Sequence, residues 1–244
     1  MKQLILILAV FFTSTLTAQE GEPRPTPRHP DGTPDFSGVW SGGGPIGDIA
    51  GGLIPGEVML LTPEYARIKA GRMAAEDPEA NCLPTGVPRI APYPWRILQT
   101  PAYGPATHLY FIFEGNVHSY RQIFMDGREH PPENELDPTW YGHSIGWWEG
   151  DTLVIDSVGF NDLTWFDFLA NPHSTQLHTI ERYTRIDHDT LENITTIIDP
   201  AAYVQPFTIR YEARLQPEDW DLMEYVCNEN NQDVEHIRGP ARLF

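Results

Sequence analysis

The sequence predicts an all-β protein, built as an antiparallel barrel with long N-terminal loops and one short helix. From residue 94 onward, runs rich in β-branched and aromatic residues are separated by short turn signals such as Glu149-Gly150. Residues 207–215 alternate between apolar and polar side chains, which is typical of a strand with one buried face. Because successive strands are joined mostly by short turns, we expect a meander that closes into a barrel.

The expected strands follow one another along the second part of the chain. They cover residues 96–100, 108–114, 117–125, 143–148, 152–158, 177–186, 191–198, 207–215 and 222–226. A further strand is expected earlier, at Gly38-Val39-Trp40. A Gly-x-Trp on the first strand resembles lipocalin-like (calycin-type) barrels, in which the Trp closes one end, often beneath an arginine from a late strand. Arg210 or Arg214 would then be that arginine, and the alternative is a buried aromatic residue of any β-domain.

The N-terminal part contains the single helix that we expect, over residues 61–76. Thr62 is a suitable N-cap, and Pro63 suits the first helical position because the N–H group that it lacks would have no helical partner there. An apolar stripe is expected from Tyr65, Ile68 and Met73. The Gly-rich residues 42–56 and the Pro-containing residues 77–93 predict irregular loops on either side.

The chain divides into three parts. Residues 1–18 combine one lysine, an apolar run and small residues before the expected cut, which predicts a secretory signal peptide. Residues 19–34 are rich in proline and predict an extended leader. Residues 35–244 are long enough for one domain with a sizeable core. This organisation predicts a periplasmic or secreted protein without membrane insertion, because no later apolar run could span a bilayer.

The two cysteines, Cys82 and Cys227, predict one disulfide, because an exported protein enters an oxidising compartment. Such a bond would tie an early loop to the last expected strand. The alternative is a pair of buried thiols.

Composition limits the classes of partner. Asp and Glu number 34 against 16 Lys and Arg, so the formal net charge is −18. Such an acidic surface argues against nucleic acid and anionic membranes as partners. The sequence has no Gly-rich phosphate loop after a strand, so nucleotide chemistry has no support. Residues 142–146 (GHSIG) match the G-x-S-x-G motif of serine hydrolases, but the helix that should follow the serine is not expected here. The partner that we expect is a small molecule, and the oligomeric state stays open.

Polar residues drawn from distant segments predict a functional site. The groups expected to perform acid–base chemistry are His143, Asp156, Tyr141, His173 and Arg121. An imidazole titrates near neutral pH, and a carboxylate on the paired strand can orient it. The groups expected to bind the substrate are Trp165, Phe168, Asn161, Trp147 and Glu181. The long connection over residues 160–177 would then close over an apolar ligand.

These candidates have structural alternatives. His143 could instead bond a backbone carbonyl, and Arg121 could only neutralise a buried carboxylate. No cofactor is expected, although His143, His173 and His178 with a carboxylate could bind a divalent metal ion.

The strings GHSIGWWEGDTLVIDSVGFN, RQIFMDGREHP and HTIERY together resemble a large family of secreted bacterial proteins, most of which have no assigned function. The resemblance covers residues 35–227 and implies no activity. The matching positions are Arg121, Asp126, Arg128, His130, Gly142, His143, Trp148, Glu149, Asp151, Asp156, Asn161, Glu181 and Arg182. At Trp147 the family more often has arginine or lysine, which implies a more apolar site if that side chain faces the pocket.

These observations predict a cofactor-independent acid–base enzyme of lyase, isomerase or cyclase type. Its substrate would be a small, largely apolar organic molecule inside the barrel. The first alternative is a periplasmic carrier of a hydrophobic ligand, which a purely apolar cavity would favour. The second is a carbohydrate-interacting protein, which requires Trp147, Trp148 and Trp165 to lie exposed on one side. Two or more ionisable groups within hydrogen-bond reach in the cavity would favour the enzyme.

Overall fold

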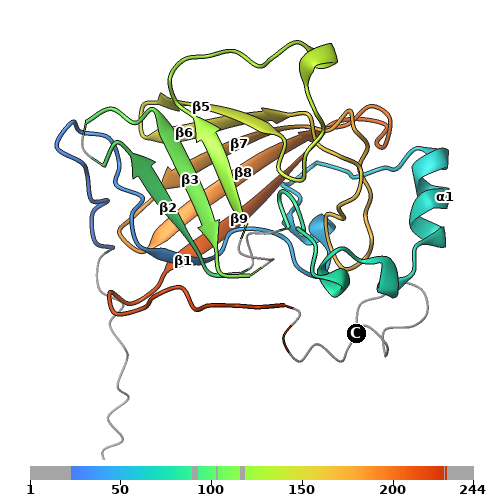
Figure 1. Ribbon diagram of the computed structural model, residues 1–244, viewed down its shortest axis with the longest axis horizontal. Helices are drawn as coiled ribbons and strands as arrows, with labels where there is room; N and C mark the ends of the chain where they lie inside the picture. The colour runs from blue at the N-terminus through green and yellow to red at the C-terminus, as the bar shows by residue number, and fades with distance from the viewer. Residues whose placement is uncertain (1–22, 90–92, 103, 116–118, 228, 230–244) are drawn as a thin grey trace, which may run out of the picture.

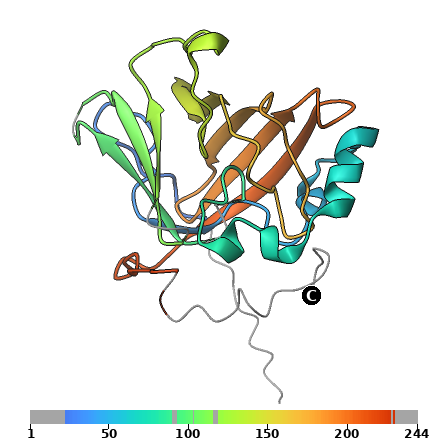
Figure 2. The same ribbon diagram turned by 45° about the vertical axis from the view of Figure 1, so that its right-hand side comes forward.

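The protein is a closed β-barrel with one α-helix beside it. The structure is a computed structural model and describes residues 23–89, 93–102, 104–115, 119–227 and 229. Within these residues nine strands close into one barrel (Figures 1 and 2), which confirms the predicted all-β barrel. The strands are β1 Val39–Gly42, β2 Trp95–Thr100, β3 His108–Phe113, β4 Tyr120–Phe124, β5 His143–Glu149, β6 Thr152–Val158, β7 His178–Arg185, β8 Thr190–Ile198 and β9 Phe207–Leu215.

Strands that are adjacent in the sequence are also adjacent in the barrel, and β1 pairs with β9 to close it. The pairs are antiparallel except for β4–β5, which is parallel, so the expectation of a purely antiparallel barrel is wrong at this place. A parallel pair needs a long connection, because the chain must reverse before the second strand begins. Residues 125–142 provide it, as a loop that carries the short 3₁₀ helix η4 Glu133–Glu135 and stands above β5 in both views (Figures 1 and 2).

The expected strand at 222–226 is wrong, because residues 221–226 have no regular structure. The pairing of β1 with β9 explains this result, since it leaves no free barrel edge that a further strand could join. The other expected strands are present, with ends that differ by a few residues.

The barrel interior is filled by side chains. Trp40, Trp95, Phe111, Ile155 and Leu191 belong to the core cluster, and each is at most 2% exposed. The cavity beside the polar residues of the interior measures about 10 Å³, roughly the space of one water molecule.

Trp40 is fully buried in the core, and the arginine over its ring is neither of the two expected ones. The guanidinium of Arg185, on β7, lies 4.9 Å from the centroid of the Trp40 ring. Arg185 also donates to the carbonyl oxygens of Asp35 and His188. The expected Arg210 and Arg214 are exposed, because strand alternation turns both to the outer face of β9.

Helix α1 spans Pro63–Gly71, within the expected range, and the predicted apolar stripe is wrong. None of its residues is buried, and Ile68 and Met73 are each about 40% exposed. Of the three expected residues, Tyr65 packs against the second core cluster, and Lys69 of the helix donates to the side chain of Asn171. Thr62 precedes it as expected, but the Thr62 hydroxyl donates to the carbonyl of Ala201 rather than capping the helix.

The Pro-rich leader lies along the barrel as an extended strap over its described part, residues 23–34. Arg28 pairs with Asp151 in the β5–β6 turn, and Arg24 pairs with Asp189 in the β7–β8 turn. Exposed pairs of this kind stabilise little individually. The expected signal peptide, 1–18, lies outside the described residues. In the part of the chain that the structure describes, no helix has the length and apolar character needed to cross a membrane.

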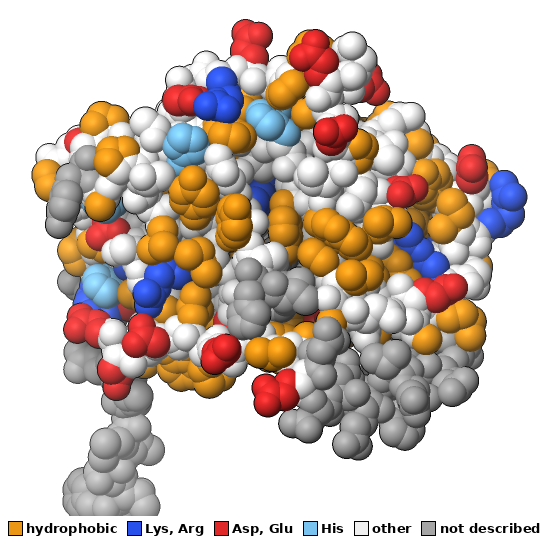
Figure 3. All heavy atoms as spheres, in the orientation of Figure 1, with side chains coloured by type: hydrophobic (Ala, Val, Ile, Leu, Met, Phe, Trp, Pro, Cys, Tyr) orange, Lys and Arg blue, Asp and Glu red, His pale blue; other side chains and the backbone are white. Residues whose placement is uncertain are grey.

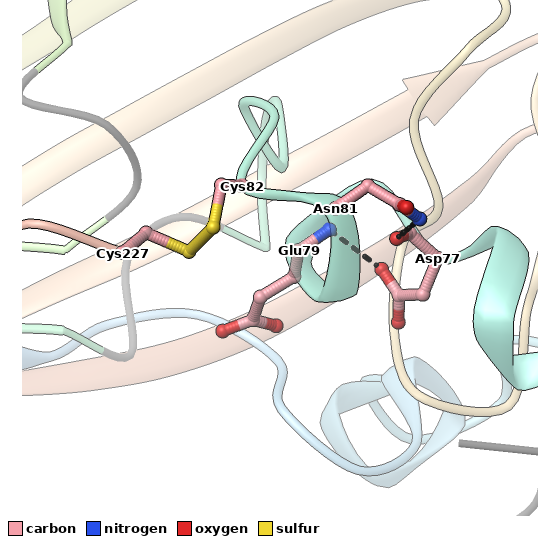
Figure 4. Close-up of a disulfide and its surroundings, with 5 residues drawn as sticks. All are labelled: Asp77, Glu79, Asn81, Cys82 and Cys227. Atoms are coloured by element: carbon pink, nitrogen blue, oxygen red, sulfur yellow. Dashed lines mark hydrogen bonds between the residues drawn. A yellow bond between two sulfur atoms is a disulfide. The ribbon is translucent and has the colours of Figure 1, made fainter. Parts of the chain in front are cut away.

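The predicted disulfide is confirmed. Cys82 and Cys227 are bonded, with Cα atoms 5.5 Å apart (Figure 4). Cys82 follows the 3₁₀ helix η3 Glu79–Asn81, where the side chain of Asp77 accepts from the backbone N–H of Glu79 (Figure 4). The bond joins this early loop to the segment after β9 rather than to a strand. A disulfide of this kind fits an oxidising compartment.

Candidate functional site

Strand pleating divides the predicted site residues between the two faces of the barrel wall. Successive side chains of a strand point to opposite faces. Arg121 on β4 and Glu181 on β7 face the interior and are 3% and 1% exposed. His143 on β5 and Asp156 on β6 face outward and are partly exposed. The single polar constellation that was expected inside the barrel is therefore two clusters on opposite faces.

The interior cluster is a buried ion pair with hydrogen-bonded neighbours. Arg121 bonds Glu181 through Nη2, and the same nitrogen donates to Ser157 Oγ at 2.8 Å. Its Nε donates to Ser144 Oγ at 3.1 Å. Tyr183 donates to the other Glu181 oxygen at 3.1 Å. Burial acts to lower the pKa of Arg121, but the charge of Glu181 outweighs it and the pKa is raised.

The outer cluster joins three histidines to one carboxylate. His130, from the β4–β5 loop, lies between two partners: its Nδ1 is 2.8 Å from His143 Nδ1, and its Nε2 is 3.0 Å from Asp156 Oδ1. His178 Nε2 lies 2.8 Å from the same carboxylate oxygen. The expectation that Asp156 orients His143 directly is therefore wrong, because His130 stands between them. In the strand register, Asp156 pairs with Ile145 rather than with His143.

These contacts determine the tautomer of each neutral imidazole. An ionised carboxylate only accepts hydrogen bonds, so His130 must donate to Asp156 from Nε2. Its Nδ1 then has a lone pair and accepts from Nδ1–H of His143. The remaining nitrogen of His143, Nε2, therefore has a lone pair, and no described residue bonds it. Such a nitrogen can act as a base.

The surroundings of His143 keep it neutral. Its ring stacks on Phe124, with ring centroids 5.0 Å apart. The guanidinium of Arg128 lies over the same Phe124 ring, 3.8 Å from its centroid. Burial lowers the pKa of His143 from its ordinary value, and the nearby positive charge of Arg128 lowers it further. At neutral pH the imidazole is thus free to accept a proton.

Asp156 stays ionised. Burial acts to raise its pKa, but the hydrogen bonds from His178 and His130 outweigh that effect and the pKa is lowered. A carboxylate that remains charged can hold two imidazoles in fixed tautomers.

A cleft of about 440 Å³ opens beside the parallel strand pair. β4 and β5 share only two residue pairs in register, so the first half of β4 separates from the segment before β5. The cleft is lined by residues of β4, β5 and the loop between them, among them Arg121, Phe124, Leu136, Tyr141, His143 and Ser144. Its volume lies in the range of small-molecule sites. Both clusters reach it, because Arg121 and His143 line the same cleft from the inner and outer faces.

Two other side chains that line this cleft can donate hydrogen bonds, whereas the free nitrogen of His143 is an acceptor. Arg121 uses Nε and Nη2 within the protein, while its Nη1 bonds no described residue. The hydroxyl of Tyr141 contacts Ser119, and burial raises the pKa of Tyr141 to about 12, so the hydroxyl stays protonated. Both donors could stabilise a negative oxygen.

His173 lies elsewhere. It is 1% exposed, its Nδ1 donates to the carbonyl of Ser174, and its Nε2 accepts from Thr164 at 2.5 Å. The ring stacks on Phe166 in the second core cluster. Burial lowers the pKa of His173. Both ring nitrogens are thus used within the fold, which fits a structural role.

The expected substrate-binding residues do not gather at the cleft. Trp165 is buried, with the guanidinium of Arg72 over its ring, and Phe168 is 37% exposed beneath Arg89. Asn161 accepts from the backbone N–H of Leu163 in a local turn. Glu181 lies in the interior cluster, and Trp147 is exposed and donates to Glu149. Residues 164–167 and 170–174 are buried, and none of residues 160–177 lines the cleft.

His130 is the site residue that sequence reasoning did not select as a candidate. It matched the resembled family pattern, but it follows an Asp-Gly turn and carries no strand pattern that could orient it. Among the described residues, no group of three or more His, Cys, Asp or Glu side chains is arranged to hold a metal ion.

Comparison with known proteins adds no family assignment: no family model, curated protein or solved structure matches the chain. The resemblance to a family of secreted bacterial proteins stays a prediction, and the site is interpreted from its own geometry.

Proposed function

We propose that this protein is an acid–base enzyme of lyase, isomerase or cyclase type, with its active site in the cleft between β4 and β5. His143 is the base, and His130 and Asp156 are positioning residues that hold its tautomer. The substrate is a small, largely apolar organic molecule with an acidic C–H group next to a carbonyl.

One observation supports this proposal above the others. His143 and Arg121 line the same cleft, and each has one nitrogen, Nε2 and Nη1 respectively, that bonds no described residue. A base and an oxyanion donor facing one cleft are the arrangement that proton abstraction next to a carbonyl requires.

The step moves one proton. Nε2 of His143 takes the proton from the substrate carbon. The electron pair of the C–H bond forms a C=C bond, and the π pair of the carbonyl moves to its oxygen, which gives an enolate. Arg121 Nη1 and the Tyr141 hydroxyl donate to that oxygen. The positive charge that forms on His143 is stabilised by the hydrogen bond to His130. His130 is in turn hydrogen-bonded to Asp156, which remains ionised. The imidazolium then returns the proton to the product or to its leaving group.

The alternatives have less support. A carrier that holds its ligand inside the barrel lacks space beside Arg121, where the cavity is about 10 Å³. The carbohydrate hypothesis requires three exposed indole rings, but Trp165 is 3% exposed and Trp148 packs against Phe36. The disulfide supports a periplasmic or secreted location for the enzyme.

Carbon–hydrogen exchange tests the proposal without knowledge of the final product. The protein is incubated in D₂O with a panel of small ketones and aldehydes, and deuterium incorporation is followed by NMR. For at least one compound, we expect the exchange rate with the wild type to exceed the rate with His143→Gln by about 100-fold or more. His29→Gln, which changes a partly exposed histidine outside the cleft, should leave the rate unchanged.

His130→Gln should keep the base but lose its fixed tautomer, so its rate should fall between those of the wild type and His143→Gln. Equal exchange in the wild type and His143→Gln, or no acceleration across the whole panel, would contradict the proposal.

A further inference from the structure

A second cleft lies on the other side of the β4–β5 loop and plays no part in the proposed reaction. It measures about 670 Å³. Pro131 and Leu136 of the loop line both clefts, so the loop is the wall between them. The floor is formed by outward-facing side chains, including Val158 on β6 and Ile198 on β8.

The polar side chains of this cleft include Glu133, Thr175 and Gln176, and one more, His178, belongs to the outer cluster. His178 lines the cleft and donates from Nε2 to the ionised Asp156. In that tautomer its Nδ1 has a lone pair, and no described residue bonds it. The outer cluster therefore reaches both clefts: His143 lines the first, while His130 and His178 line the second.

The rest of the lining limits the chemistry of an occupant. Most of the side chains are apolar, among them Pro138, Leu177 and Pro200. Glu133 is a carboxylate at this cleft, and the chain has a net charge of −18. Acidic side chains also lie around the rim of the face shown in Figure 3, while apolar ones gather in its middle. An anion is therefore disfavoured, whereas an apolar molecule that offers a neutral donor fits.

We infer that the second cleft is a binding site for a neutral, largely apolar molecule with one hydroxyl group, and that this hydroxyl donates to Nδ1 of His178. The inference does not depend on the proposed reaction, because it requires neither catalysis nor His143. It assigns a ligand class to a cleft that the acid–base chemistry leaves unused.

Three matched naphthalenes test the ligand class on the full-length wild type at pH 7 by isothermal titration calorimetry. 2-Naphthol has the apolar body and the donor, 2-methoxynaphthalene lacks the donor, and 2-naphthoate is an anion. We expect 2-naphthol to bind about tenfold more tightly than 2-methoxynaphthalene, as one hydrogen bond allows. The naphthoate should bind weakest. Equal affinities for the naphthol and its methyl ether, or no binding of the naphthol, would overturn the inference.

Substitutions locate the bound naphthol. Ile198→Trp fills the second cleft and should abolish binding, while the matched Ile194→Trp, on the same outer face of β8, should not. His178→Phe should remove the preference for naphthol over its methyl ether. Gln122→Trp obstructs the first cleft and should leave binding intact.

The inference fails if Gln122→Trp abolishes binding and Ile198→Trp does not, because the probe then occupies the first cleft. Far-UV circular dichroism of each variant reports folding. The comparison of naphthol with its ether on the wild type holds even if a variant does not fold. If the wild type and His143→Gln exchange deuterium equally, the proposed reaction is refuted. The naphthol titrations do not depend on that exchange, so the two failures are distinguishable.

Discussion

Glu181→Leu should destabilise the protein far more than an equivalent change at the surface. The substitution leaves the guanidinium of Arg121, 3% exposed, without its counter-charge. An unpaired charge of this kind costs about 3–5 kcal/mol, and Tyr183 loses the acceptor of its 3.1 Å bond, which costs about 1 kcal/mol more. For a chain of this size the melting temperature should fall by about 10 °C or more.

The matched control is an exposed ion pair between β5 and β7, which lie on either side of β6. Glu149 pairs with Arg182 at 2.7 Å, but both side chains are more than two-fifths exposed. Solvent screens such a pair, so Glu149→Leu should cost less than about 1 kcal/mol. Arg182 directly follows Glu181 in the chain, and strand alternation alone places the two pairs on opposite faces.

Equilibrium unfolding in urea, with the disulfide intact, measures both changes. Tryptophan fluorescence and far-UV circular dichroism should give coincident transitions if unfolding is two-state. The double variant Arg121→Met with Glu181→Leu should recover at least about 2 kcal/mol relative to the sum of the single changes. If Glu181→Leu costs no more than Glu149→Leu, the interior charge is not buried in solution and the reasoning is wrong.

Three further predictions concern the outer cluster, the disulfide and the turn before β5. Since the pKa of His143 is lowered in the folded state, the unfolded state takes up the proton first, and stability should fall as the pH drops through about 6.5. Arg128→Gln should raise the His143 pKa in an NMR titration, and an unchanged value would exclude Arg128 as a cause. Reduction of the disulfide should cost about 5 kcal/mol in urea unfolding, because the bond closes a sequence separation of 145 residues, and an unchanged midpoint would contradict this. Gly142→Ala should lower the melting temperature more than Gly127→Ala. Both glycines have positive φ, but only at Gly142 does the added carbon meet backbone, 2.6 Å from a carbonyl oxygen at the end of β6.

The fold class could be predicted because its signals are local. Alternation along 207–215 follows from the two-residue period of a strand, and it requires no knowledge of what the strand packs against. The turn at Gly150 is similarly local, since glycine has little steric cost at positive φ. The disulfide followed from the count of two cysteines and an expected oxidising compartment.

The outcome at the last expected strand depended on the whole barrel. Residues 222–226 have β-forming side chains, but the pairing of β1 with β9 had already satisfied both edges. The same argument holds for the arginine above Trp40. Sequence position suggested a residue of β9, whereas the closed geometry brings Arg185 of β7 over the ring.

By itself, the sequence determined which residues share a face within each strand, for example that Glu181 and Arg182 lie on opposite faces of one strand. Only the tertiary structure decided which side is the interior. It also decided that His130 would stand between His143 and Asp156. The physical reason is that pleating is a property of one strand, whereas inside and outside exist only once the strands close into a barrel. The loop that connects the parallel strands β4 and β5 carries His130, and it takes its position only against that closed wall.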